Sequence, residues 1–221
     1  MEPTLTCRRE GGREIPVLVW RLAGPALGIS SGPLGGGLGV RRWVLNATVP
    51  MSYARDDPDL HLADMARGLG LDGPGAGLLT GVDVADAVRA AEAGVTVWAT
   101  VGVGAPIQAA AAVADPLPVA GGHPAGTINV VAFVPARLSE AALVNTVATA
   151  TEAKVQALRD LGIAGTGTAT DAVCVLCAPD GPAMPYGGPR SAWGAPLARA
   201  VYAAVREGAA IDGVPWSERV R

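Results

Sequence analysis

Short apolar runs rich in Val, Ile and Leu alternate along this chain with longer segments in which apolar residues recur every three or four positions. Runs of about four to eight residues between turn residues are typical of buried strands, and the longer period is typical of helices. The predicted strands are Val17–Leu22, Leu27–Ser31, Trp43–Val49, Gly77–Val82, Val95–Val101, Thr127–Val134 and Asp171–Ala178. The predicted helices are Leu60–Gly70, Val84–Ala93, Glu140–Leu161 and Ala195–Glu207.

Capping residues support three of these helices. Asp59 and Asp83 can cap the first two, Ser139 precedes the long third helix, and Gly162 ends it. The mixture of strands and helices predicts an α/β or α+β fold, a single-domain layered sandwich over residues 1–221 in which helices flank a mixed sheet. A four-layer αββα arrangement is the alternative.

Composition and charge exclude several classes of protein. The net charge is −3 without any block of like charges, which argues against nucleic acid as a partner. No apolar run is long enough for a membrane span or a secretory signal, so we expect a cytoplasmic protein without a membrane partner. A homo-oligomer remains open.

Cysteine and histidine give no metal-binding pattern. Cys174 and Cys177 have C-x-x-C spacing, but they lie in a predicted strand, where positions i and i+3 point to opposite faces. The two histidines, His61 and His123, lack ligand spacing. We therefore expect structural cysteines and no metal site.

Four segments contain residues suited to binding or catalysis, whereas the interiors of the predicted helices and strands offer few such residues. The first, Ser30–Gly39, contains Gly35, Gly36 and Gly37 in a row, whose N–H groups can approach an anion or a carbonyl oxygen. It lacks the lysine of a phosphate-binding loop, and a plain glycine turn is the competing interpretation.

The second segment places Asn46 in the middle of a predicted strand, shortly before Tyr53. A buried amide must find hydrogen-bond partners, so Asn46 either holds a neighbouring loop or faces a ligand. The third segment enters a strand with Thr127 and Asn129 on one face, suitable for polarising an amide carbonyl. His123 in the same loop is either an incidental exposed histidine, which its neighbour Pro124 and the loop setting favour, or a general base.

The fourth segment contains Lys154, the only lysine among 17 basic residues. Helical spacing puts Lys154 in the apolar stripe of its helix, which favours either a task that needs a compact or desolvated amine or a packed stem with a solvated head. In the following turn, Thr168 and Thr170 offer hydroxyl groups and Asp171 can pair with Lys154. A hydrogen-bonded turn without chemistry is the alternative.

From about Ile29 to Ala209 the chain resembles the adenosylcobinamide amidohydrolases, enzymes of corrinoid salvage. The matching segments are Ser30–Gly37, Leu45–Tyr53, Asp57-Pro58, Gly77–Thr80, Ala99–Gly102, Gly126–Asn129, Ala150–Lys154 and the Gly-Thr-x-Thr-Asp block that ends at Asp171. Ala105-Pro106 departs from the expected Asn-Ala, which leaves the loop around Gly104 without an assigned role.

This resemblance implies hydrolysis of the amide that joins the corrin ring's propionyl side chain to aminopropanol, with a corrinoid substrate and no separate cofactor. We expect Thr127 to act as nucleophile or to position water, Lys154 as base and then acid, and Asp171 to hold Lys154. Asn129 and glycine-loop N–H groups would receive the oxyanion. The expected substrate-binding residues are Ser30, Ser31, Gly35, Gly36, Gly37, Asn46, Tyr53, Thr168 and Thr170. A non-catalytic corrinoid-binding protein and a hydrolase of another small amide are the alternatives.

Overall fold

A computed structural model describes residues 1–112, 126–211 and 216 of the chain. Its strands are β1 (Thr4–Glu10), β2 (Arg13–Ser30), β3 (Gly37–Thr48), β4 (Gly75–Thr80), β5 (Val88–Glu92), β6 (Val95–Val101), β7 (Ile128–Val134) and β8 (Ala172–Cys177). Its helices are α1 (Pro58–Gly68), α2 (Glu140–Asp160) and α3 (Gly194–Ala209), with a short 3-10 helix η1 (Val84–Asp86).

All eight strands belong to one mixed sheet with the order β4-β3-β2-β8-β7-β6-β5, and β1 pairs with β2 beside this path. The β3–β4 and β7–β8 pairs are parallel, and the other pairs are antiparallel. The predicted mixed sheet flanked by helices is therefore confirmed.

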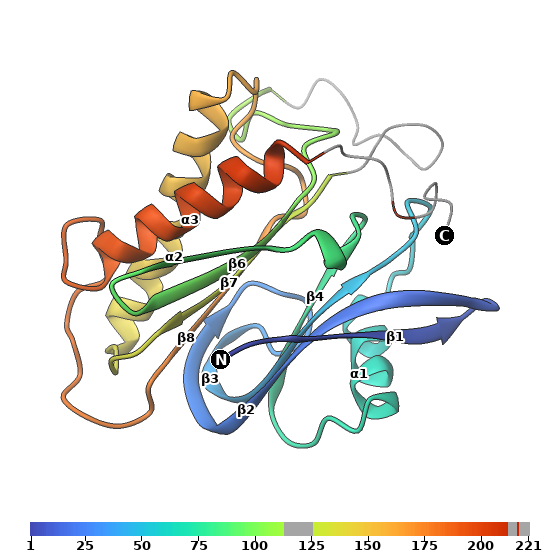
Figure 1. Ribbon diagram of the computed structural model, residues 1–221, viewed down its shortest axis with the longest axis horizontal. Coiled ribbons are helices and arrows are strands. Elements are labelled where there is room, and N and C mark those ends of the chain that lie inside the picture. Colours follow the sequence, from blue (N-terminus) through green and yellow to red (C-terminus); the bar gives the residue numbers. More distant parts are fainter. Residues whose placement is uncertain (113–125, 212–215, 217–221) are drawn as a thin grey trace.

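The sheet doubles back on itself at β2. The register between β2 and β3 shifts between Arg21 and Ala26, where the chain reads Leu-Ala-Gly-Pro. Gly24 and Pro25 weaken the ladder at this point, and a strand can there turn from one layer into the next. Figure 1 shows the resulting curve of β2 and β3 below the β6–β8 half of the sheet.

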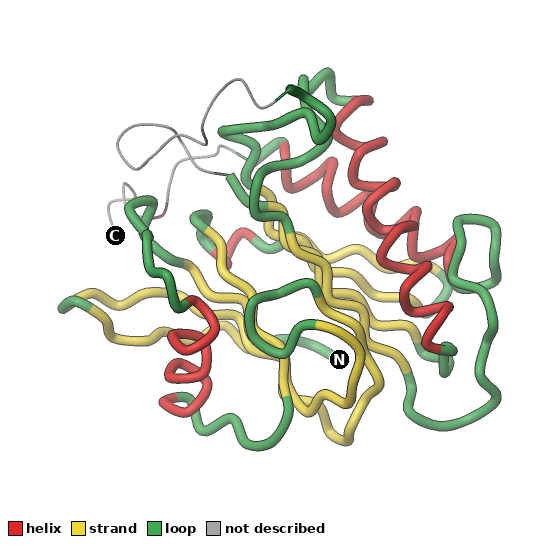
Figure 2. Tube along the Cα trace, turned by 180° about the vertical axis from the view of Figure 1, so that it is seen from behind, coloured by secondary structure: helices red, strands yellow, loops and turns green. Residues whose placement is uncertain are grey.

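The two halves of the sheet share an apolar core to which β2, β3 and β4 contribute from one side and β6, β7 and β8 from the other. Trp20 and Trp98 meet edge to face in this core, with ring centroids 5.8 Å apart. Helices α2 and α3 cover the outer face of the β5–β8 half, and α1 covers the outer face of β2 and β3 (Figures 1 and 2). The layers thus follow the αββα order, with both β layers drawn from one sheet.

The predicted helix Val84–Ala93 was wrong, because η1 is followed there by the edge strand β5. Glu92 pairs with Val95 across a two-residue turn in which Ala93 and Gly94 both have positive φ. This turn joins β5 to β6, and strand pairing overrides the helical preference of the alanines. Strand β1 was not predicted either, because most of its residues are polar. It pairs with β2 in a hairpin whose turn contains Gly11 and Gly12, both with positive φ.

The other elements follow the prediction with small shifts. The predicted strands Val17–Leu22 and Leu27–Ser31 fall in the single strand β2, which ends at Ser30, and Asp57 rather than Asp59 precedes α1. Ser139 caps α2 by accepting a hydrogen bond from the Ala142 N–H at 3.1 Å, and Gly162 follows the helix with a φ of 73°.

Cys174 and Cys177 are buried on opposite faces of β8, as the spacing in a strand predicted. Burial raises the pKa of the Cys174 thiol to about 12. Both thiols are free, and burial, which raises the pKa of Cys177 as well, disfavours the reactive thiolate. None of the described helices is long and apolar enough to cross a bilayer.

Candidate active site

Asp171, directly before β8, is the centre of a largely buried hydrogen-bond network. One carboxylate oxygen, Oδ1, accepts from the Ile128 N–H at 2.9 Å and from the Thr168 hydroxyl at 2.5 Å. The other, Oδ2, accepts from the Thr168 N–H at 3.1 Å and from the Lys154 ammonium. Four donors occupy the four lone-pair sites of the carboxylate, so Asp171 ties together α2, β7 and the turn before β8.

Lys154 reaches Asp171 from the apolar stripe of α2. The stripe packs Leu143, Ala150 and Leu158 against the sheet, and it leaves the Lys154 side chain only 10% exposed. The ion pair that the sequence predicted is therefore present and largely shielded from water. Gly167 lies directly against it, since a Cβ there would be 2.4 Å from the Lys154 Nζ.

Thr127 and Thr170 form a second contact at the same strand ends. Asn129 pairs with Ala172 in the parallel β7–β8 ladder, and continuing that register by two residues places Thr127 opposite Thr170. Their hydroxyl oxygens are 2.6 Å apart. Thr127 is buried and Thr170 is exposed, so this pair lies at the surface end of the two strands.

Asn129 belongs to a third group, in the core between the two halves of the sheet. Its Nδ2 donates to Asn46 Oδ1 at 2.9 Å and to the Leu79 carbonyl at 2.8 Å, while Asn46 Nδ2 donates to Thr100 at 3.0 Å. These bonds join β7 to β3 and β4 across the sandwich. Among the described residues, none gives a hydrogen bond to Asn129 Oδ1.

These groups lie on opposite faces of β7 and β8. Val173 packs toward α2 and α3, so Asp171, two residues earlier, also points to the helix side. Val131 packs into the core between the halves of the sheet, and Asn129 shares its face. The backbone of Thr127–Ile128 and Thr170–Asp171 connects the two faces, so the starts of β7 and β8 form the centre of the candidate site.

A family model described as adenosylcobinamide amidohydrolase matches residues 2–213. The chain belongs to this family. A Methanosarcina mazei protein named adenosylcobinamide amidohydrolase is 31% identical over 194 residues, which cover 84% of this chain and 90% of the relative. A Halobacterium salinarum protein of the same name is 40% identical over 199 residues, which cover 85% of this chain and 82% of the relative.

In this member of the family, the hydroxyls of both serines that were predicted to bind substrate accept hydrogen bonds from backbone N–H groups. The Ser30 hydroxyl accepts from the Gly32 N–H at 3.0 Å, and the Ser31 hydroxyl accepts from the Val173 N–H at 3.0 Å. The Ser31 N–H also donates to the Val173 carbonyl at 3.0 Å. The end of β2 is thereby fixed beside the start of β8, close to Asp171.

The glycine loop after Ser31 is held by Arg41. The guanidinium donates to the carbonyls of Gly35 at 2.6 Å, Gly37 at 3.0 Å and Val40 at 2.9 Å. Gly36 is exposed between these anchored residues. Sequence reasoning missed Arg41, although an arginine in a strand that is otherwise mostly apolar is a usable signal.

Tyr53 lies apart from Asp171, in a cluster that joins α1 to the β1–β2 hairpin. Its hydroxyl is 3.1 Å from His61 Nδ1, and the two rings stack. His61 Nε2 is 3.2 Å from Glu10, which also accepts from Arg8 at 2.9 Å. Burial lowers the pKa of His61 and raises that of Tyr53.

The segment with the unexpected Ala105-Pro106 braces the threonine turn. The Ile107 N–H donates to the Gly167 carbonyl at 2.8 Å, and the Thr166 N–H donates back to Ile107 at 2.8 Å. This contact holds Gly167 against the ion pair. It could not be read from the sequence, because Ile107 and Gly167 are 60 residues apart.

Residues 1–112, 126–211 and 216 contain no cluster of three or more His, Cys, Asp or Glu side chains suited to a metal ion. His123 lies outside the described residues.

Proposed function

We propose that this protein hydrolyses the amide bond of adenosylcobinamide to adenosylcobyric acid and aminopropanol, with Lys154 as its central acid–base residue. The family and the names of both relatives support the reaction. The assignment to residues rests on the shielded pair of Lys154 and Asp171, whose carboxylate accepts from the Ile128 N–H directly after Thr127.

Amide hydrolysis adds water across the C–N bond. The hydroxyl group goes to the carbonyl carbon, and a proton goes to the departing nitrogen of aminopropanol. The enzyme must therefore supply an activated nucleophile, a stabiliser for the negative oxygen and a proton donor.

An ammonium has three N–H donors and no acceptor, so it must give up a proton before it can act as a base. Asp171 takes one of the three N–H donors of Lys154, which leaves the others for substrate. We assign Lys154 to stabilise the oxyanion and to give a proton to the leaving amine, and the neutral amine of Lys154 then takes up the proton that the attacking hydroxyl or water releases. Asp171, whose lone pairs are all occupied, acts as a positioning residue.

Thr127 is our candidate for the nucleophile or for the residue that positions the attacking water. Its hydroxyl contacts the exposed Thr170, and the next backbone N–H, that of Ile128, donates to Asp171. Asn129 must break one of its two donated bonds to serve an oxyanion, so we assign Asn129 and Asn46 to hold β7 against β3 and β4. We propose no separate cofactor, since cobalt enters with the substrate.

The deciding experiment is incubation with adenosylcobinamide, followed by mass spectrometry for a new free carboxylate. Lys154→Met should abolish turnover without loss of helical signal. Arg159→Met, which removes an exposed cation near the end of the same helix, should retain wild-type rates. Wild-type rates in Lys154→Met would remove lysine from the mechanism.

The same assay separates the alternatives. Binding of adenosylcobinamide without any new carboxylate would identify a corrinoid-binding protein. Cleavage of another small amide alone would identify a different hydrolase. Cobinamide without the adenosyl group and complete cobalamins should be run in parallel to define the corrinoid range.

A further inference from the structure

The segment after β6, residues 102–109, joins the two parts of the candidate site. At its start, the Gly102 N–H donates to the Thr127 carbonyl at 3.0 Å. Further along, the Ile107 N–H donates to the Gly167 carbonyl at 2.8 Å. The segment therefore connects the start of β7 to the turn that packs against the ion pair.

The backbone of this segment is fixed to the turn by several bonds. Thr166 donates from its N–H to the Ile107 carbonyl at 2.8 Å, and its hydroxyl accepts from the Ala109 N–H at 3.0 Å. Gly165 makes this approach possible, since a Cβ there would be 2.7 Å from the Pro106 Cβ. The turn thus satisfies both polar backbone groups of Ile107, whose side chain takes no part in these bonds.

The Ile107 side chain is 39% exposed, although its backbone is fixed beside the ion pair. The bond to the Gly167 carbonyl and the close contact of Gly167 with Lys154 place the Ile107 nitrogen within about 9 Å of the Lys154 Nζ. A large aliphatic side chain on a fixed backbone can bind a ligand without a further loss of backbone freedom. Ile107 is therefore a preorganised apolar contact next to the reaction centre.

The two segments that meet at Ile107, residues 102–112 and 161–170, form what we call the rim. They contain no Asp, Glu, Lys or Arg, although 17% of the whole chain is charged. Ile107, Ala164 and Ala169 are exposed within them. An uncharged surface with exposed apolar side chains favours a neutral, largely apolar ligand over an ionic one.

The ion pair is shielded too well to admit a macrocycle. The side chains of Lys154 and Asp171 are only 10% and 12% exposed. A short amide-bearing arm can reach a shielded ammonium, whereas the ring that carries the arm must stay on the surrounding surface. That surface is where the rim lies.

We propose that the rim receives the corrin macrocycle and that Ile107 is its main apolar contact, an inference that rests on the proposed function. The methyl groups and C–H edges of the ring pack on Ile107, and the neutral peripheral amides meet no charged side chain of the rim. The short separation between Ile107 and Lys154 lets the reacting arm reach the ammonium while the ring stays outside. Ile107 is thus a specificity-determining residue that acts on binding of the ring.

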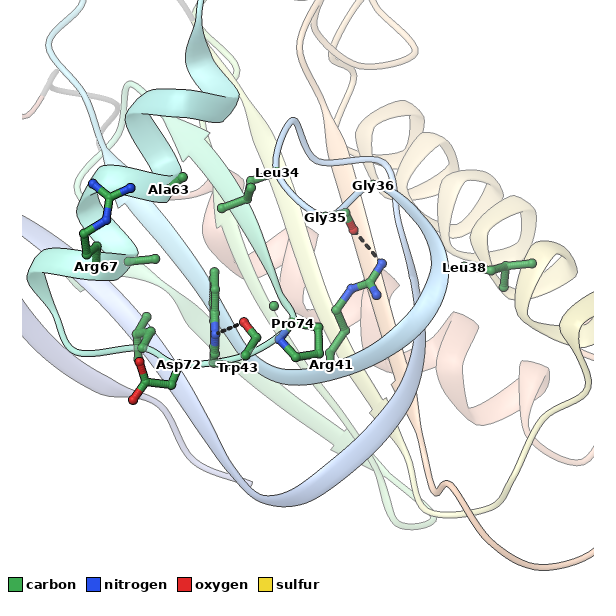
Figure 3. Close-up of a pocket in the computed structure, with 14 residues that line it drawn as sticks. Leu34, Gly35, Gly36, Leu38, Arg41, Trp43, Ala63, Arg67, Asp72 and Pro74 are labelled. Atoms are coloured by element: carbon green, nitrogen blue, oxygen red, sulfur yellow. Dashed lines mark hydrogen bonds between the residues drawn. The ribbon is translucent and has the colours of Figure 1, made fainter.

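Another partly apolar surface of the molecule differs from the rim in charge. A hollow of about 590 Å³ between α1 and the glycine loop has Arg41, Arg67 and Asp72 among its lining residues, as Figure 3 shows. Neither Lys154 nor Asp171 lines it. The rim, and not this hollow, adjoins the reaction centre.

Shortening the Ile107 side chain tests the inference. Ile107→Ala keeps every backbone hydrogen bond and should raise KM for adenosylcobinamide about tenfold, with kcat within about twofold of wild type. Ile107→Leu keeps the apolar surface and should stay near the wild-type KM. Val144→Ala, which shortens an aliphatic side chain that is 54% exposed on α2, is the matched control and should change neither constant. Ten residues, about 15 Å of helix, separate Val144 from Lys154.

A charge at the same position gives a second test. Ile107→Asp should raise KM more than Ile107→Ala, because covering a carboxylate with an apolar ring is unfavourable, whereas Val144→Asp should leave KM unchanged. Circular dichroism checks that each variant is folded.

The outcomes separate this inference from the proposed function. A wild-type KM in both Ile107→Ala and Ile107→Asp overturns the inference while the proposed function stands. A lower kcat at unchanged KM assigns Ile107 to bracing the turn and overturns its contact with the ring. A wild type that neither binds nor cleaves adenosylcobinamide overturns the proposed function itself.

Discussion

The carboxylate of Asp171 has no free lone pair, and this sets the chemistry that it can perform. Lys154 and Thr168 donate to it from the side chains, and Ile128 and Thr168 donate from the backbone. A group so occupied fixes the position of its donors and is poorly placed to accept a substrate proton. At the scale of single residues, the candidate site is thus one positioned ammonium and one positioned pair of hydroxyls.

Asp171→Asn should destabilise the fold by about 3–5 kcal/mol, because it leaves a buried ammonium without its counter-charge. Lys154→Met combined with Asp171→Asn should cost clearly less than the two single changes added together. Denaturant unfolding of the four proteins measures this coupling. Asp64→Asn, which breaks an exposed pair on α1, serves as control and should change little. Additive costs would contradict the coupled pair.

At the scale of elements, the cluster of Glu10, His61 and Tyr53 fastens the β1–β2 hairpin to α1. His61 Nε2 lies 3.2 Å from a Glu10 carboxylate oxygen, and His61 Nδ1 lies 3.1 Å from the Tyr53 hydroxyl. Burial lowers the pKa of His61, and the charges of Arg8 and Arg55 act in the same direction, whereas Glu10 raises it.

The stability of the protein should therefore fall as the pH drops below 6.5, the ordinary histidine pKa. Below pH 6.5 His61 binds a proton in the unfolded chain but stays neutral in the folded protein. The free energy of unfolding therefore decreases until the pH reaches the lowered pKa of folded His61. Denaturant unfolding between pH 7.5 and about 5 measures it. His61→Gln should flatten this part of the profile, and an identical slope in both proteins would contradict the role of His61.

At the scale of the whole molecule, one sheet forms both inner layers of the sandwich. The contact between Trp20 and Trp98 lies in the core that the two halves share. Because β2 runs through both halves, neither half has a core of its own on the inner side. We expect the halves to unfold together.

Trp98→Ala should cost about 3–5 kcal/mol, whereas Trp98→Phe should cost less because it leaves a smaller cavity. Far-ultraviolet circular dichroism and tryptophan fluorescence should report one coincident transition in both variants. Separate midpoints for the two signals would show that the halves of the sheet unfold independently.

Much of the architecture could be predicted from the pattern of apolar residues. Strand β6 and the start of α2 fall where the period placed them, and Lys154 lies in the buried stripe that its spacing predicted. The helix expected at Val84–Ala93 failed because β5 takes its structure from pairing with β6 across Ala93 and Gly94. A local period carries no information about such a partner.

The sequence by itself determined the mixed α/β class, the family, the buried lysine and its pairing with Asp171, because these depend on local period, composition and near spacing along the chain. Only the tertiary structure decided that the sheet doubles back at β2, that Asn129 bonds to Asn46, and that Arg41 holds the glycine loop beside a hollow. Those contacts join residues that are close in space but often distant in sequence, and the bend of β2 is what brings β3 and β4 against β7.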